Sequence, residues 1–381
     1  MKNLGIYIHI PFCIKKCDYC DFISYCDKNN LIEVYIEKLK EEITNNLDNK
    51  EYTVKTIYIG GGTPSSIDSK DIVEILNTIK EKCNLENAEV TIELNPGTDT
   101  ENKLLDYKKA GINRLSIGLQ ETNNKLLKQI GRIHTYEKFL ETYNFARKIG
   151  FKNINVDLMI GLPNQSIGNI KDSLEKIIKL NPEHISVYSL ILEEGTKLRK
   201  KYEEKQIELP DDELERNMYW YVKNTLENNG YIHYEISNFA KPGYKSKHNV
   251  SCWNQEEYIG FGVAAHSYIN GIRYSNTNNL DEYINNVDPK RSDHFWSTSK
   301  IIHEVQTKED MKKEYMLLGL RKIDGVNVQN FKNKFGENPI FLFRNELNKL
   351  VEENLIIVDG DNIKLTNKGL DLANLVWKEF V

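Results

Sequence analysis

Three cysteines stand close together in the segment CIKKCDYC, which follows an apolar run at the start of the chain. Cys13, Cys17 and Cys20 have the spacing C-x3-C-x2-C. Three thiolates on one loop can bind three irons of an iron–sulfur cube and leave the fourth iron open to another ligand. A zinc site is the alternative, since Cys26 and His9 lie nearby in the sequence and zinc takes the same donor types.

Glycine and polar residues also recur at the ends of predicted strands. The run GGGTP occupies residues 60–64, and Glu93, Gln120 and Asp157 end or closely follow later strand-like runs. Strands of βα barrels carry their functional residues at their carboxyl ends. The pattern therefore predicts one site at which these residues and the cysteine loop meet.

The elements that must position this site alternate between strands and helices. Short β-branched runs indicate strands, and apolar residues at helical spacing indicate helices between them. The predicted strands are 4–10, 54–59, 89–94, 114–119, 154–160 and 184–191, and the predicted helices are 31–47, 71–82, 101–110, 136–149 and 170–180. Alternation of this kind is typical of a parallel sheet with right-handed crossovers, and six units predict an α/β fold built on a partial (β/α)6 barrel.

The pattern changes in the last third of the chain. After a helix at 211–228 and a strand at 231–239, we expect a loop at 241–254 and a glycine- and alanine-rich stretch at 258–268. Helices at 308–320, 328–335 and 340–352, a hairpin at 355–365 and a helix at 366–380 predict a small winged-helix-like C-terminal α+β domain. We therefore expect a core at 1–240, a connecting segment at 241–300 with a boundary near 289–299, and a C-terminal domain at 301–381.

Composition limits the class of protein. The 381 residues carry a net charge of −5, and the pI near 6.0 argues against a general nucleic-acid-binding surface. No apolar run is long enough to span a bilayer, and residues 1–10 lead into a strand rather than a cleavable signal. We expect a cytoplasmic protein whose six cysteines are not paired as disulfides.

Five segments resemble the radical S-adenosylmethionine (SAM) proteins of the oxygen-independent coproporphyrinogen III oxidase (HemN)-like family, which includes heme chaperones. They are YIHIPFC (7–13), GGGTP (60–64), TIELNPG (91–97), RLSIGLQ (114–120) and NVDLMIGLP (155–163). The resemblance implies that the three cysteines hold a [4Fe-4S] cluster whose open iron binds SAM. It also implies that one-electron reduction of SAM can yield a 5′-deoxyadenosyl radical.

The resemblance assigns further residues to the SAM site by matching position. Tyr7 would lie against the cluster-bound SAM, and Gly61, Gly62 and Thr63 would line its methionine moiety. Four more positions match residues that contact SAM in this family: Glu93, Gln120, Arg132 and Asp157. Whether some of these belong to a second SAM site stays open.

Two features favour a heme chaperone over an oxidase. The oxidase pattern has a fourth cysteine where this chain has Phe22, and KHNVSCW (247–253) resembles the HNxxYW motif of the chaperones. The motif makes His248 the candidate axial heme ligand, although Cys252 replaces its tyrosine. His266 and Cys252 stay open as other candidate ligands.

The predicted function is therefore a heme chaperone that binds heme and transfers it to acceptor hemoproteins such as respiratory cytochromes. The alternative is a radical SAM enzyme that converts coproporphyrinogen III to protoporphyrinogen IX, or acts on another tetrapyrrole. Whether SAM is cleaved or only bound stays open, as do a homodimer and a peripheral contact with a membrane.

Overall fold

The computed structural model describes residues 2–47, 52–285 and 300–381. Its centre is one open sheet of twelve strands in the order β12-β11-β10-β9-β1-β2-β3-β4-β5-β6-β8-β7. Six strands in the middle are parallel: β1 (Lys2–Ile10), β2 (Tyr52–Gly61), β3 (Glu89–Leu94), β4 (Arg114–Gln120), β5 (Ile154–Ile160) and β6 (His184–Ser189). This confirms the predicted partial (β/α)6 barrel, and the sheet does not close.

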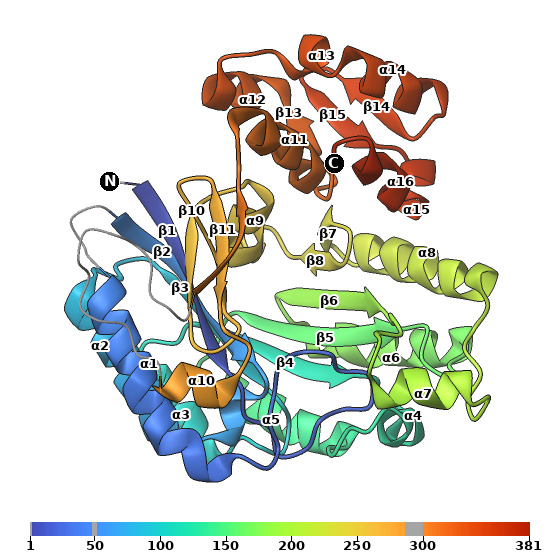
Figure 1. Ribbon diagram of the computed structural model, residues 1–381. Coiled ribbons are helices and arrows are strands. Elements are labelled where there is room, and N and C mark those ends of the chain that lie inside the picture. The colour runs from blue at the N-terminus through green and yellow to red at the C-terminus, as the bar shows by residue number, and fades with distance from the viewer. Residues whose placement is uncertain (1, 48–51, 286–299) are drawn as a thin grey trace.

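The crossover helices lie along the outer side of the parallel strands (Figure 1). They are α1 (Ile32–Asn46), α2 (Ser69–Lys82), α3 (Glu101–Lys109), α4 (Asn124–Gln129), α5 (Tyr136–Lys148) and α6 (Ile167–Leu180). Helix α6 shows why they form: the Ser166 side chain caps its N-terminus in a capping box, and Asn181 ends it in the left-handed conformation. Its buried Ile170, Leu174 and Ile177 recur at helical spacing and face the core.

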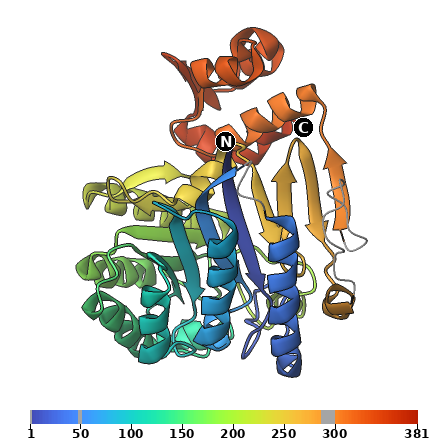
Figure 2. The same cartoon turned by 90° about the vertical axis from the view of Figure 1, so that its left-hand side faces the viewer.

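Strand β1 joins two parts of the sheet. It pairs in parallel with β2 on one side and with β9 (Tyr258–Phe261) on the other. Beyond β9 the sheet continues antiparallel through β10 (His266–Ile269), β11 (Ile272–Asn276) and β12 (Lys300–Val305). Figure 2 shows these strands side by side on the flank of β1, away from β2. The opposite end of the sheet carries β8 (Asn238–Ala240) and β7 (Ile232–Glu235).

Helices α7 (Lys197–Glu203) and α8 (Asp212–Asn228) lie between β6 and β7 in the chain, α9 (Lys247–Trp253) lies between β8 and β9, and α10 (Leu280–Asn285) lies between β11 and β12. The expected loop at 241–254 is wrong in its second half, where α9 forms. The Ser246 side chain caps this helix by accepting a hydrogen bond from the Asn249 backbone N–H. The expected strand at 231–239 is broken by a turn into β7 and β8.

The C-terminal elements form a second body next to β7 and α9 (Figure 1). They are α11 (Lys308–Gly319), β13 (Val326–Asn327), α12 (Val328–Phe335), α13 (Pro339–Leu342), α14 (Arg344–Glu352), β14 (Ile356–Asp359), β15 (Asn362–Leu365), α15 (Asn367–Asp371) and α16 (Ala373–Lys378). The predicted hairpin is confirmed as β14–β15, whereas the predicted last helix is two helices that meet at Leu372.

Buried apolar residues form one large core around the sheet and a separate core among the C-terminal elements. The predicted boundary at 289–299 lies outside the described residues, and the division at 240 and 300 stays a prediction. In the described parts of the chain, no helix is long and apolar enough to cross a membrane.

Candidate functional site

The cysteine loop leaves β1 and folds back against its own start. Residues Phe12 and Tyr25 form a β-bridge, and the backbone N–H of Cys13 donates to the Tyr25 carbonyl oxygen at 3.0 Å. Cys13 is buried, whereas Cys17 and Cys20 are partly exposed. The loop is therefore anchored at both ends and holds its three thiols between them.

Two residues from outside the loop, Thr63 after β2 and Arg132 after α4, contact these thiols. The Thr63 hydroxyl hydrogen-bonds Cys13 Sγ at 3.3 Å, and Arg132 Nη1 donates to Cys17 Sγ at 3.5 Å. Burial raises the pKa of Cys13, and it raises the pKa of Cys20 to about 11. Both thiols are thus protonated at neutral pH in the metal-free chain, and binding of a metal must displace their protons.

The three cysteines line one cavity of about 420 Å³. Its wall includes ten of the twelve residues predicted for the site: Cys13, Cys17, Cys20, Gly61, Gly62, Thr63, Glu93, Gln120, Arg132 and Asp157. They come from the cysteine loop and from the carboxyl ends of β2 to β5 or the residues that follow them. The strand ends and the cysteine loop therefore meet at one cavity, as the sequence pattern predicts.

The glycines of GGGTP fit tightly against the end of β1 and the start of the cysteine loop. Gly61 has φ of +110°, and a Cβ there would lie 2.6 Å from the His9 imidazole. A Cβ on Gly62 would lie 2.9 Å from the Phe12 carbonyl oxygen, which also accepts a 2.8 Å hydrogen bond from the Thr63 backbone N–H. These glycines are required for packing of β2 against the loop, besides lining the cavity.

Glu93 and Asp157 place two carboxyl groups in the cavity wall. The Tyr58 hydroxyl donates to Glu93 Oε1 at 2.8 Å, and Asn155 Nδ2 donates to Asp157 Oδ1 at 2.7 Å. Burial raises the pKa of Glu93 to about 7, and it raises the pKa of Asp157 as well. A bound cation would favour the charged form of both groups, since its charge offsets the loss of water.

Arg132 brings a positive charge to the same cavity. Its Nη2 donates to Asn95 Oδ1 at 2.7 Å and to the Gly118 carbonyl oxygen. Its Nε is buried and has no hydrogen-bond partner among the described residues. An unpaired buried donor beside the cysteine thiols suits an acceptor supplied by a bound group.

The donor set on the loop consists of three thiols, the donors that an iron–sulfur cube takes. In the described part of the chain, no group of three His, Cys, Asp or Glu side chains is spaced to hold one metal ion. The thiolates of a cube stand further apart than those of a zinc site because each binds a different iron. The zinc alternative therefore gains no support from the geometry.

Two predicted residues do not line the cavity. Tyr7 lies behind its wall, where its hydroxyl hydrogen-bonds His9 Nδ1 at 3.0 Å and its ring stacks on Tyr58. His248 is 7% exposed, and its Nδ1 shares a 2.9 Å hydrogen bond with the Thr56 hydroxyl. The His248 ring also stacks on Tyr58 at 5.3 Å, and burial lowers its pKa to about 4. It is a neutral imidazole on a helix facing β2, not a side chain of a surface loop.

The sequence analysis missed the part of the cavity wall that follows β5 and β6. Met159, Tyr188, Ser189, Leu190 and Ile191 line the cavity, and Ile191 is 67% exposed. Their position at strand carboxyl ends is the signal that could have identified them. Phe22 also lines the cavity and is 63% exposed, so the position without a fourth cysteine presents an apolar ring there.

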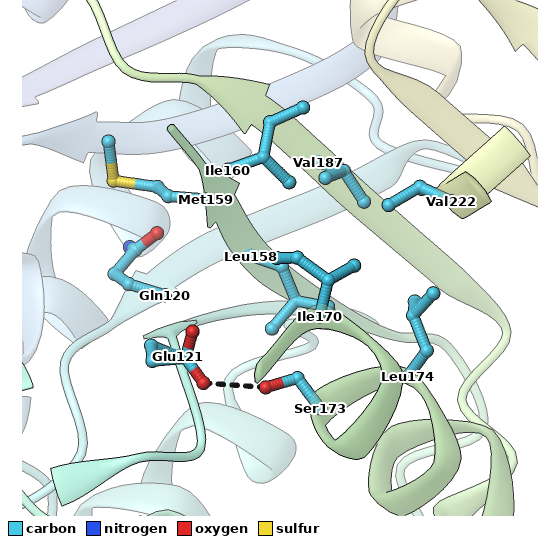
Figure 3. A pocket seen from close by; sticks show the side chains of 10 residues that line it. All are labelled: Gln120, Glu121, Leu158, Met159, Ile160, Ile170, Ser173, Leu174, Val187 and Val222. Carbon is cyan, nitrogen blue, oxygen red and sulfur yellow. Dashed lines mark hydrogen bonds between the residues drawn. The ribbon is translucent and has the colours of Figure 1, made fainter. Parts of the chain in front are cut away.

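A smaller cavity of about 10 Å³ lies next to this site, and Figure 3 shows the side chains around it. Gln120 lines both cavities, and its φ of +72° occurs where β4 and β5 shift register. The adjacent Glu121 is buried and fixes this irregular turn, because it accepts hydrogen bonds from Ser173 at 2.6 Å and from Gln165 at 2.8 Å. The smaller cavity holds one water molecule at most, so it is too small to be a ligand site.

Comparison with known proteins identifies the class first. Residues 7–177 match the radical SAM superfamily, and residues 306–372 match the HemN C-terminal domain. The solved structure of coproporphyrinogen III oxidase (HemN) from Escherichia coli has the same fold, with a TM-score of 0.83 and 23% identity over 100% of this chain and 90% of that one. The fold is thus that of a radical SAM protein with a HemN-type C-terminal domain.

Curated relatives then identify the family. The chain is 38% identical to the heme chaperone HemW of Lactococcus lactis subsp. lactis (strain IL1403), over 100% of this chain and 98% of the relative. It is also 38% identical to the heme chaperone HemW of Bacillus subtilis (strain 168), over 98% of each chain. The chain belongs to the HemW family of heme chaperones, which confirms the predicted family.

Proposed function

We propose that this chain binds heme as cargo and passes it to acceptor hemoproteins such as respiratory cytochromes. The observation that carries the proposal is full-length similarity to relatives named heme chaperones, at 38% identity. Phe22 supports it, because the cavity wall has a phenyl ring where the oxidase pattern has a cysteine. Transfer requires only that the acceptor bind heme more tightly than this chain does.

The same proposal includes a [4Fe-4S] cluster held by Cys13, Cys17 and Cys20, with SAM at its open iron. The bound group would supply one-electron chemistry on SAM. In support, the cavity wall offers Gly61, Gly62 and Thr63 near the thiols, and it offers four polar side chains: Glu93, Gln120, Arg132 and Asp157. The carboxyl of Glu93 suits the cationic groups of SAM, and the guanidinium of Arg132 suits its carboxylate or the cluster thiolates.

The test is a heme titration of the anaerobically purified protein, followed by absorbance, with and without a reconstituted cluster. We expect saturable binding of one heme per chain, followed by loss of the heme spectrum when an apo-cytochrome of higher affinity is added. Absence of saturable binding in both forms would remove the proposal. Incubation with coproporphyrinogen III, SAM and a reductant should give no protoporphyrinogen IX, and turnover would favour the oxidase alternative.

We also propose that the protein works in the cytoplasm, with at most a peripheral contact to a membrane that holds the acceptor. Cell fractionation with a salt wash tests this proposal. Retention in the membrane fraction after the wash would contradict it, since an electrostatic contact is screened by salt.

A further inference from the structure

The parallel strands present one face of the sheet to the cavity that the three cysteines line, and this face continues onto the antiparallel strands. Tyr7 of β1 stands opposite Gly260 of β9, His266 of β10 stands opposite Ser275 of β11, and Ser275 stands opposite Ile301 of β12. Paired residues on neighbouring strands point to the same face. These residues therefore form one row across five strands, with Tyr7 beside the cavity and Ile301 at the edge of the sheet.

Gly260 allows β9 and β10 to lie close together in the middle of this row. A side chain at Gly260 would collide with the His266 carbonyl oxygen, so glycine is needed for the close approach of β10 to β9. Two strand spacings separate β1 from β10, which puts the backbones of Tyr7 and His266 about 10 Å apart. Burial lowers the pKa of His9, and the neighbouring His266 adds a smaller effect in the same direction.

Two exposed imidazoles meet on this face. The rings of His266 and His303 stack with centroids 5.1 Å apart and planes at 16°. His303 Nε2 shares a 2.8 Å hydrogen bond with the Ser275 hydroxyl, which fixes its ring. His266 is exposed, and among the described residues its ring nitrogens have no hydrogen-bond partner. A solvent-facing imidazole with a free nitrogen is suited to bind a metal centre.

The surroundings of His266 suit an iron porphyrin. Ile301, in the same row, is 46% exposed and offers an apolar surface to a porphyrin face. Arg273 lies nearby as a cation and is held by an ion pair with Glu314 at 2.7 Å.

We propose that His266 is the iron ligand of a heme bound on the face of β10 to β12, and that His303 is the residue that positions its ring. The inference rests on the proposed function and names the site of the cargo. The step is a ligand exchange, in which an imidazole nitrogen donates its electron pair to the iron and a water molecule leaves. His266 lies outside the wall of the cysteine cavity, so the cluster and SAM keep their own space.

The two other candidate ligands are less accessible. His248 is 7% exposed, is hydrogen-bonded to Thr56 and is covered by the Tyr58 ring, so it would reach heme only if α9 moved. Burial raises the pKa of Cys252 to about 11, which keeps its thiol protonated and a poor iron ligand at neutral pH. Of the three candidate ligands, only His266 is both exposed and free of a hydrogen-bond partner among the described residues.

The test compares hemin titrations of the full chain, carrying its cluster, in the wild type and in His266→Ala, His303→Ala and Ser251→Ala. Ser251 lies on α9 and bonds the His248 carbonyl oxygen, so its variant is a matched control outside the proposed site. We expect His266→Ala to lose the imidazole–iron signature in resonance Raman spectra and to regain a similar signature when free imidazole is added. We expect His303→Ala to keep the signature and to bind about tenfold more weakly.

The outcomes separate this inference from the proposed function. An unchanged heme spectrum in His266→Ala, with saturable binding in the wild type, overturns the inference and leaves the chaperone proposal intact. Loss of the signature in a His248→Asn variant but not in His266→Ala assigns the ligand to α9 and also overturns it. Absence of hemin binding by the wild type removes the proposed function itself. Equal binding of metal-free protoporphyrin by all variants confirms that the His266 effect acts through iron.

Discussion

The carboxyl group of Glu93 should make the stability of the cluster-free chain depend on pH. Burial raises its folded-state pKa from 4.5 to about 7. Between these values the folded chain holds a proton that the unfolded chain has released, so the free energy of unfolding falls as pH rises. The two pKa values differ by about 2.5, and each pKa unit corresponds to about 1.36 kcal/mol. The free energy of unfolding is therefore lower by about 3 kcal/mol at pH values above the folded-state pKa.

Replacement of Glu93 by glutamine should remove this pH-dependent fall in the free energy of unfolding. Gln at position 93 keeps an oxygen that accepts the 2.8 Å hydrogen bond from Tyr58, and it carries no charge to bury. We expect the free energy of unfolding of Glu93→Gln to exceed that of the wild type by less than about 1 kcal/mol at about pH 5 and by about 3 kcal/mol at about pH 8.

The assay is urea unfolding of the chain without cluster or SAM at both pH values. Glu352→Gln, at an exposed carboxylate, is the control and should shift stability equally at both. Equal effects of Glu93→Gln at the two pH values would refute the reasoning, because the burial cost of the charge would then be absent.

Three further predictions concern the loop, the glycine run and α9. Cys17→Ser should leave iron near background after anaerobic reconstitution with iron and sulfide, and wild-type iron content would contradict its role. Gly62→Ala should lower the free energy of unfolding by about 1–3 kcal/mol, because its Cβ would meet the Phe12 carbonyl oxygen at 2.9 Å. Gly168→Ala, which meets only a side-chain oxygen at 3.5 Å, should be neutral or stabilising in the same urea assay. His248→Ala should cost about 2 kcal/mol of stability, since it leaves a cavity and an unpaired Thr56, and an unchanged urea midpoint would show that its burial is not structural.

The parallel half of the fold could be predicted because its signals are local. Alternating β-branched runs and helical periodicity identify β1 to β6 and the helices between them, and chain order then gives their neighbours. The pairing of β1 with β9 could not be predicted. Tyr258–Phe261 has only four residues, and its partner lies about 250 positions earlier, so no local pattern connects the two.

The cavity residues could be predicted because strand carboxyl ends meet at one edge of a parallel sheet. The environment of His248 could not be predicted in the same way, since its burial depends on α9 packing against β2. The N-cap residue Ser246 is the sequence signal that could have indicated this helix. The stacking of His266 on His303 depends on the order of the antiparallel strands, which their sequences do not encode locally.

The position of β1 in the sheet bears on how the chain folds as it is synthesised. Its β9-facing edge stays unpaired until residues near 258 leave the ribosome. At about 5–20 residues per second, that delay after Ile10 is on the order of 10–50 s. An apolar strand with a free edge is prone to pair with other chains during such a delay. The nascent protein is therefore expected to need protection from aggregation before it can protect any cargo of its own.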